Sequence, residues 1–218
     1  MANRLFLIDG MAIIYRAYFA FIKNPRITSS GEDVSAIFGF INSLFDIQKK
    51  YNPTHIAVAF DRSEPTFRHE MFLDYKANRE ETPEAIRFAI PVIKEFLQAM
   101  SIPILEKAGF EADDIIASYV RYGEENKIPT TVFSSDKDLF QLLSANTRIM
   151  DPMKNVEIDE AKVMDKFGVG PDKITDVQAL IGDSVDNIPG VPGIGPKTAA
   201  KLINEFGTFD ELLAKKDQ

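Results

Sequence analysis

Three short apolar segments of the chain each end at an aspartate, and this pattern constrains the fold more than any other feature of the sequence. The segments span residues 5–8, 56–60 and 130–135, and the acids that follow them are Asp9, Asp61 and Asp136. Segments with helical hydrophobic spacing lie between and around them, at residues 12–21, 35–49 and 84–100. Strands that alternate with helices favour an α/β fold with a mostly parallel central sheet and helices on both faces. Because ligands of such sheets bind beyond the carboxyl ends of the strands, we expect the three aspartates to lie close together in one site.

A second acidic group begins the helix expected after residue 110. Glu111, Asp113 and Asp114 fall within four positions, directly before an apolar segment with helical spacing. The helix dipole favours acids in a first turn, and aspartate also ends strands and caps helices, so each acid alone has an ordinary structural explanation. Together with the strand-end aspartates, the group predicts one shared acidic pocket. Carboxylates at short range need a counter-charge, and oxygen ligands of this kind suit Mg²⁺ or Mn²⁺ rather than zinc.

The composition excludes several classes of protein. Of the 218 residues, 45% are hydrophobic and 27% are charged, which is the balance of a globular protein. The sequence contains no cysteine, so a disulfide framework and a zinc site built on thiolates are both excluded. The absence of a secretory leader pattern and of a membrane-length apolar run predicts a cytoplasmic protein without membrane contact.

Residues 62–83 differ in character from the segments on either side. They are rich in charged side chains and contain few periodic hydrophobic residues, so we expect a solvated segment outside the core. Two further strands are expected at residues 102–105 and 148–150. Pro103 indicates that the first of these is an edge strand, because proline cannot donate a hydrogen bond to a neighbouring strand.

After residue 155 the composition changes again. A short helix is expected at residues 174–182, and Asp183 and Asp186 follow it. The two aspartates are three positions apart, so they would share one face if this stretch were helical.

A glycine–proline hairpin at residues 188–195 leads into a helix that begins at Pro196. Gly193 and Gly195 permit a close approach of another backbone, and the exposed amides at this helix start would hold a phosphate. Two basic side chains lie nearby, those of Lys197 and Lys201. A simple turn between helices is the alternative, but the pattern Gly-Ile-Gly-Pro-Lys is typical of a helix–hairpin–helix that binds the backbone of a DNA duplex.

Six motifs, in this order, resemble those of the 5′-nuclease (flap endonuclease) superfamily, and most closely the N-terminal 5′→3′ exonuclease domain of bacterial DNA polymerases I. The motifs are Ile8-Asp9-Gly10, Phe60-Asp61, Tyr75-Lys76-x-x-Arg79, Glu111-Ala112-Asp113-Asp114, Ser135-Asp136-Lys137-Asp138 and Gly182-Asp183-x-x-Asp186. The resemblance covers essentially the whole chain, although such domains usually continue with more helices beyond the position of Gln218. It implies a PIN-like α/β nuclease core at residues 1–155, with a helical arch at about 62–83. It also implies a helical region at 156–218 that carries the helix–hairpin–helix.

The resemblance further implies two divalent cations, Mg²⁺ or Mn²⁺, and allows a K⁺ ion at the hairpin. The first cation would be held, directly or through water, by Asp9, Asp61, Glu111 and Asp113, with Asp114 close by. The second would be held by Asp136, Asp138, Asp183 and Asp186. Such a pair hydrolyses a phosphodiester when one cation generates and aims a hydroxide and the other stabilises the leaving 3′ oxygen. The catalytic group implied in this way consists of Asp9, Asp61, Asp113, Asp136, Lys76 and Arg79.

The same resemblance implies which residues contact DNA. Lys76 and Arg79 would contact the phosphate near the scissile bond, Tyr75 would stack on a base, and Arg68 would be a further phosphate ligand. Gly193, Gly195, Lys197 and Lys201 would hold the duplex. The implied activity is that of a structure-specific 5′→3′ exonuclease and 5′-flap endonuclease in replication and repair. Its substrates would be DNA with a 5′ flap, a nick or a single-stranded 5′ end, and RNA primer–DNA junctions. The protein would act in the bacterial cytoplasm at the nucleoid, as a monomer or as part of a larger polymerase chain.

Three rival interpretations explain less of the sequence. A PIN-type ribonuclease shares the strand-end aspartates but gives no reason for the hairpin or the arch. A DNA-binding module without catalysis would not need acids that repel phosphate, and a receiver-like phosphoacceptor domain explains neither the Asp183–Asp186 pair nor the hairpin. The net charge of −8 does not argue against DNA binding, because the nine acids of the implied metal site exceed it and two divalent cations would halve it.

Overall fold

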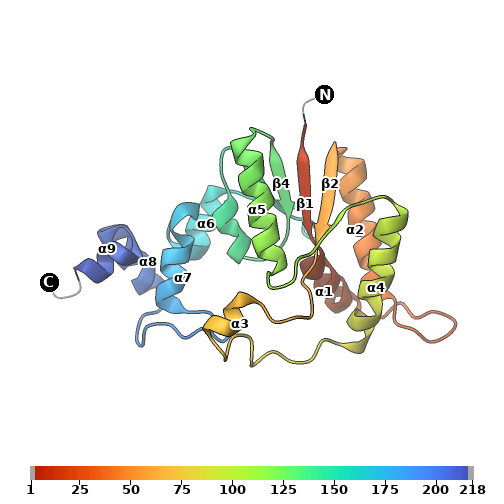
Figure 1. The fold of residues 1–218 in the computed structure, drawn as a ribbon, viewed down its shortest axis with the longest axis horizontal. Helices are drawn as coiled ribbons and strands as arrows, with labels where there is room; N and C mark the ends of the chain where they lie inside the picture. Colours follow the sequence, from red (N-terminus) through yellow and green to blue (C-terminus); the bar gives the residue numbers. More distant parts are fainter. Residues whose placement is uncertain (1–2, 216–218) are drawn as a thin grey trace.

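The computed structural model describes residues 3–215 and contains a six-stranded sheet (Figure 1). The strand order is β3-β2-β1-β4-β5-β6, and the first five strands are parallel to one another while β6 runs antiparallel to β5. The strands are β1 (Leu5–Asp9), β2 (His55–Ala59), β3 (Ile104–Leu105), β4 (Thr130–Phe133), β5 (Thr147–Asp151) and β6 (Val156–Ile158). The predicted α/β fold with a mostly parallel sheet is therefore confirmed, and so is the edge position of the strand that follows Pro103. The antiparallel strand β6 is an addition that the apolar pattern did not predict.

Helices cover both faces of the sheet, because alternate side chains of each strand point to opposite sides. One core contains Phe6, Ile8 and Val58 together with the buried faces of α1 (Gly10–Phe21), α2 (Ser35–Tyr51) and α4 (Glu84–Ala99). The other core contains Leu7, Ala57 and Val132 and the buried face of α5 (Ala112–Glu125). The C-terminal helices α6 (Glu160–Phe167), α7 (Ile174–Ile181) and α8 (Pro196–Phe206) join this second core, and α9 (Phe209–Ala214) packs against α8.

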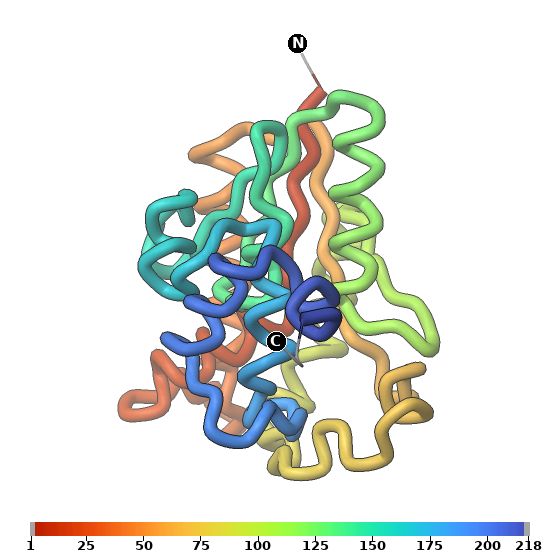
Figure 2. The backbone as a smooth tube through the Cα atoms, turned by 90° about the vertical axis from the view of Figure 1, so that its left-hand side faces the viewer, coloured from red at the N-terminus to blue at the C-terminus, as the bar shows by residue number. Residues whose placement is uncertain are grey.

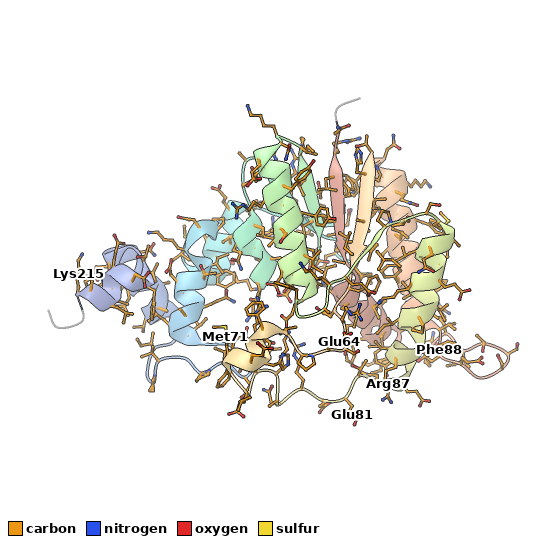
Figure 3. All side chains as sticks on the ribbon, viewed as in Figure 1. Glu64, Met71, Glu81, Arg87, Phe88 and Lys215 are labelled. Carbon is orange, nitrogen blue, oxygen red and sulfur yellow. The ribbon has the colours of Figure 1, made fainter. Side chains whose placement is uncertain are left out.

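The segment at 62–83 crosses the carboxyl ends of the strands and contains one short helix, α3 (Phe67–Met71) (Figures 1 and 2). The exposed side chains of Met71 and Leu73 fit the expected solvated segment, and Met71 projects from α3 in Figure 3. The expectation is wrong for Tyr75, which is only 5% exposed. We call residues 62–83 the arch.

Hydrogen bonds tie the middle of the arch to the turn between α7 and α8. The amide of Lys76 donates to the carbonyl of Asp186 (2.9 Å), and the side chain of Asn78 donates to the carbonyl of Ser184 (2.8 Å). In the opposite direction, the side chain of Asn187 donates to the carbonyl of Asp74 (2.7 Å). Two segments that are more than 100 residues apart in sequence therefore lie side by side.

The stretch that carries Asp183 and Asp186 is a turn rather than a helix. The helix α7 ends before Gly182, whose φ of +69° lies in the left-handed region that favours glycine. A backbone bridge between Asp183 and Ile188 then closes the turn. Among the described helices, none is long and apolar enough to cross a membrane.

Candidate active site

Asp9 lies at the carboxyl edge of the sheet, where it is the central member of a group of acids that we call the acidic floor. It ends β1 and caps α1, because its Oδ1 accepts a hydrogen bond from the Ala12 amide (3.0 Å). Its Oδ2 accepts a hydrogen bond from the Ser134 hydroxyl (2.7 Å), which follows the neighbouring strand β4. Only 5% of Asp9 is exposed, so these two contacts fix a buried carboxylate at the point where the strands end.

The start of α5 brings the second acidic group to the same edge. Asp61, which follows β2, accepts a hydrogen bond from the Ala112 amide (2.7 Å) and so ties its own loop to the first turn of α5. Glu111 caps the helix in a reciprocal arrangement with Asp114, whose Oδ2 accepts from the Glu111 amide (2.9 Å). The carboxylate of Asp113 points to the groove that Asp9 and Asp61 also line.

A third group of acids completes the floor from the other side. Asp136 accepts a hydrogen bond from the amide of Asp138 (2.9 Å), which begins the short helix η1 (Asp138–Leu142). The side chain of Gln178 on α7 donates to Asp138, and Asp183 accepts from the amides of the turn in which it lies. These acids therefore depend on the packing of α7 against η1, a contact that the sequence pattern did not reveal.

The pKa values of the acids show that the three groups interact. Burial, together with the charges of four neighbouring carboxylates, those of Asp9, Asp136, Asp61 and Asp138, raises the pKa of Asp113 to about 8. Burial likewise raises the pKa of Asp9 to about 6, although its two hydrogen bonds oppose the change. Burial is the main reason why the pKa of Asp138 is raised, and the charge of Asp136 is the second. One repulsive cluster of carboxylates has thus been built from three strand ends and two helix starts.

Basic side chains of the arch form ion pairs with this cluster. The ammonium of Lys76 lies 2.7 Å from Oε1 of Glu111 and 3.9 Å from Oδ2 of Asp186, and Arg79 forms an ion pair with Asp186. The Tyr75 hydroxyl lies 3.0 Å from both Glu111 Oε2 and Asp186 Oδ2, so it links acids of the two implied metal groups. The expected stacking of Tyr75 on a base stays a prediction, and in this structure the residue is buried, with only 5% of it exposed.

Arg68 and Asp114 lie beside the groove rather than in it, and Tyr75 is likewise absent from its lining. Arg68 donates two hydrogen bonds of 2.8 Å to the two carboxylate oxygens of Asp114, and neither residue belongs to the groove lining. This bidentate pair lowers the pKa of Asp114, even though burial opposes the shift. Arg68 and Asp114 therefore fasten the arch to the start of α5, which makes Asp114 a positioning residue in this structure.

The groove itself has a volume of about 1140 Å³ and brings together most of the predicted catalytic and metal-binding residues. Its lining includes Asp9, Asp61, Glu111, Asp113, Asp136, Asp138, Asp183, Asp186, Lys76 and Arg79. As the side chains stand, no three acids or histidines of residues 3–215 are arranged to hold a metal ion. The donor set of the groove, which consists only of oxygen, nevertheless fits hard divalent cations.

The hairpin before α8 lies outside the groove. Gly193 has a φ of +82°, Gly195 caps α8, and, apart from the adjoining residues, no atom of residues 3–215 lies within 4 Å of the position that a Cβ would take at either glycine. Lys197 and Lys201 are exposed on α8. The predicted hairpin and helix start are therefore present, and their backbone is open to a ligand.

Sequence reasoning missed several residues of this site. Ser134 holds both Asp9 and the amide of Asp136, and its hydroxyl at the end of an apolar strand was the available signal. Lys137 lies inside a quoted motif and forms an ion pair with Asp183 (2.7 Å), and Lys166 also lines the groove. No local sequence pattern indicates the contacts that either lysine makes.

Residues 4–218 match two models of one protein family. Residues 4–168 match the model described as 5′-3′ exonuclease, N-terminal resolvase-like domain, and residues 169–218 match 5′-3′ exonuclease, C-terminal SAM fold. A 5′-3′ exonuclease of Aquifex aeolicus is 41% identical over 209 residues, which cover 96% of this chain and 72% of that protein. A DNA polymerase I of Rhizobium leguminosarum is 45% identical over 220 residues, which cover 98% of this chain but only 22% of that protein.

The fold also matches solved structures. One is a bacteriophage T5 flap endonuclease in a pseudo-enzyme-product complex with DNA and metal ions, with a TM-score of 0.76 and 22% sequence identity. The match covers 98% of this chain and 79% of that one. At this level of identity, the likeness concerns the fold.

Proposed function

The chain belongs to the 5′-3′ exonuclease family, and from this premise we propose that it hydrolyses phosphodiester bonds of DNA at single-stranded 5′ ends, nicks and 5′ flaps with the help of two divalent cations. The observation that carries this proposal is the convergence of eight carboxylates from separate strand ends, helix starts and one turn on a single groove. The chain spans 22% of the polymerase that it resembles, so a role in a larger polymerase is part of the proposal. Cleavage of RNA primer–DNA junctions is likewise part of the proposal.

Asp9, Asp61, Glu111 and Asp113 would hold one cation, and Asp136, Asp138, Asp183 and Asp186 would hold the other. When bound, Mg²⁺ or Mn²⁺ at these positions supplies an activated nucleophile and neutralises the charge on the leaving oxygen. Neither of the two histidines lines the groove formed by residues 3–215, which favours this source of the nucleophile over a histidine base.

Lys76 and Arg79 would bind the phosphate that lies over the acidic floor. Both are ion-paired with acids of the implied metal sites, Lys76 with Glu111 and Arg79 with Asp186. A phosphate placed above these acids would meet both basic side chains, and each contact would be a charge-assisted hydrogen bond. Tyr75 would orient Glu111 and Asp186, because its hydroxyl is within hydrogen-bond distance of both.

The hairpin at residues 188–195 would hold the duplex at a distance from the reacting phosphate. Gly193 and Gly195 leave backbone amides open at the start of α8, and the positive end of the helix dipole favours a phosphate there. Lys197 and Lys201 would add further phosphate contacts, and a K⁺ ion at this hairpin is included in the proposal.

Incubation of the protein with a DNA duplex that carries a labelled 5′ flap tests the proposal. We expect a short single-stranded 5′ product in Mg²⁺ or Mn²⁺ and no product in chelator. Asp136→Asn should abolish cleavage, whereas the same change at the exposed Asp165 of α6 should not. The nicked duplex and an RNA primer on DNA serve as further substrates. Cleavage that persists in chelator, or no cleavage with either cation, would show that the proposed function is wrong.

A further inference from the structure

Two lysines line the groove on the side of η1 and α6, and neither belongs to the motifs that imply DNA contacts. Lys137 lies between Asp136 and Asp138, and Lys166 lies near the end of α6. The basic residues of the arch pair with acids on α5 and in the turn after α7, so these two lysines form a separate basic wall.

Lys166 is held by aromatic rings rather than by a carboxylate. Its ammonium lies 4.9 Å from the ring centroid of Phe140 and 5.8 Å from that of Phe167, and both rings are buried. Within residues 3–215 it forms no ion pair. Burial lowers its pKa, and the charge of Lys137 lowers it further, which outweighs the attraction of Asp136 and Asp138. Lys166 is exposed to the groove, and a cation beside another cation is stabilised by an anion, which no carboxylate of residues 3–215 supplies to it by direct contact.

Lys137 forms an ion pair with an acid of the implied metal site. Its ammonium lies 2.7 Å from Oδ2 of Asp183, and about a third of its side chain is exposed. Asp183 is also among the acids that would hold a divalent cation. An Asp183 carboxylate whose charge is neutralised in that way attracts Lys137 less, which leaves the ammonium available to another anion. A purely structural role explains Lys137 through its ion pair with Asp183, and the rings of Phe140 and Phe167 position Lys166, but they leave its charge without a counter-charge among residues 3–215.

Lys166 belongs to α6, one of the helices between the sheet and the helix that begins at the hairpin. In Figure 1, α6 and α7 lie between the sheet and α8. The side chain of Asn204 on α8 donates to the carbonyl of Gly168, two residues after Lys166 (2.8 Å). A duplex that is held at the start of α8 and enters the groove would run alongside α6 and α7, and so come close to these lysines.

We propose that Lys137 and Lys166 form a phosphate-binding pair that holds the cleaved strand of the duplex between the scissile bond and the hairpin. This inference rests on the proposed function and adds a contact to it: the arch binds on one side of the reacting phosphate and the lysine pair on the other. The ligand is the sugar–phosphate backbone, so the pair would contribute affinity and register without base preference.

Binding of a fluorescent 5′-flap duplex in chelator and in Ca²⁺ tests the pair without requiring hydrolysis. Lys166→Gln should weaken binding about 5- to 10-fold and reduce the salt dependence of log Kd by about one unit of slope, as expected for one lost phosphate contact. Lys137→Gln should lose more affinity in Ca²⁺ than in chelator, because Asp183 holds Lys137 only when no cation occupies that carboxylate. Lys166→Arg should retain binding, since it keeps the charge.

The matched control is Lys162→Gln, which removes the same charge from α6. Lys162 lies one turn earlier, is ion-paired with Asp159 (3.0 Å) and does not line the groove, so its loss should change affinity less than twofold. Thermal melting of each variant shows whether the fold is intact. If Lys166→Gln and Lys137→Gln bind as Lys162→Gln does, the proposal is wrong.

Neutral methylphosphonates, placed one at a time in the first phosphates 3′ of the scissile bond, locate the contact. The parent protein should lose about 5- to 10-fold in affinity at one or two positions, and Lys166→Gln should lose nothing further there. Equal losses for parent and variant at every position would refute the contact. Because every readout is binding, a protein that binds in this way but does not cleave would contradict the proposed function and still support the lysine pair.

Discussion

Removal of the charge of Asp113 should stabilise the protein in the absence of divalent cations. Burial and four neighbouring carboxylates raise the pKa of Asp113 from 3.8 to about 8. No residue of the described chain forms a hydrogen bond with this carboxylate, so Asp113→Asn replaces a repelled charge with a neutral group of the same shape and breaks no contact. Asp136→Asn is a less clean test, because Asp136 accepts a hydrogen bond from the Asp138 amide.

The sign and size of the effect follow from proton linkage. An acid whose pKa is higher in the folded state binds more protons there than in the unfolded chain, so the free energy of unfolding falls as the pH rises from about 4 towards about 8. Each unit of difference is worth about 1.4 kcal/mol. At pH 7 the upper limit is therefore about 4 kcal/mol, and relaxation of the neighbouring acids reduces it to about 2 kcal/mol. For a chain of this size that corresponds to a rise in Tm of roughly 4–8 °C.

Thermal melts in chelator, from pH 4 to pH 8.5, measure this gain. The difference in Tm between Asp113→Asn and the parent should be near zero at pH 4 and largest above pH 8. Asp165→Asn, a change at an exposed acid of α6, serves as the control and should show no such trend. A gain that is independent of pH, or a variant that melts below the parent at pH 8, would refute the argument that Asp113 lies in a repulsive cluster.

Three further predictions concern the cations and the DNA contacts. Mg²⁺ in excess of its Kd should raise the Tm of the parent more than that of Asp113→Asn, because the folded groove binds the ion and the unfolded chain does not; equal shifts in differential scanning calorimetry would contradict this. Lys76→Ala should slow single-turnover flap cleavage about 10- to 100-fold with little loss of duplex affinity, since its phosphate contact is a charge-assisted one at the reacting group; a loss confined to Kd would count against it. Lys197→Ala should instead weaken duplex binding and lower the salt slope by about one while the rate of the bound complex stays within twofold; an unchanged slope would argue against a hairpin contact.

The sheet and the strand-end acids could be predicted because each rests on local pattern. Apolar segments that end at Asp9, Asp61 and Asp136 indicated parallel strands, and the shared direction of such strands placed the acids at one edge. The helix that begins after Glu111 followed from the acids and apolar spacing in the same way. The hairpin before α8 was also predictable, since Gly195 and Pro196 are characteristic of a helix start.

The remaining features depend on contacts between distant segments. Tyr75 is buried because its hydroxyl meets Glu111 and Asp186, and nothing in the charged sequence around it indicates that contact. The turn at Asp183 is set by the left-handed Gly182 and by a bridge to Ile188, whereas spacing alone also allowed a helix. The strand β6 is short and largely exposed, and it is defined only by its pairing with β5.

Titration of Mn²⁺ into the parent protein, followed by the electron paramagnetic resonance signal of the free ion, tests the central claim most directly. The account predicts two ions bound per chain. It also predicts fewer than two for Asp136→Asn, whose carboxylate belongs to the cluster, and an unchanged number for Asp165→Asn. Binding of no Mn²⁺ by the parent, or the same number of ions in Asp136→Asn, would show that the carboxylates of this groove do not form a site for two divalent cations.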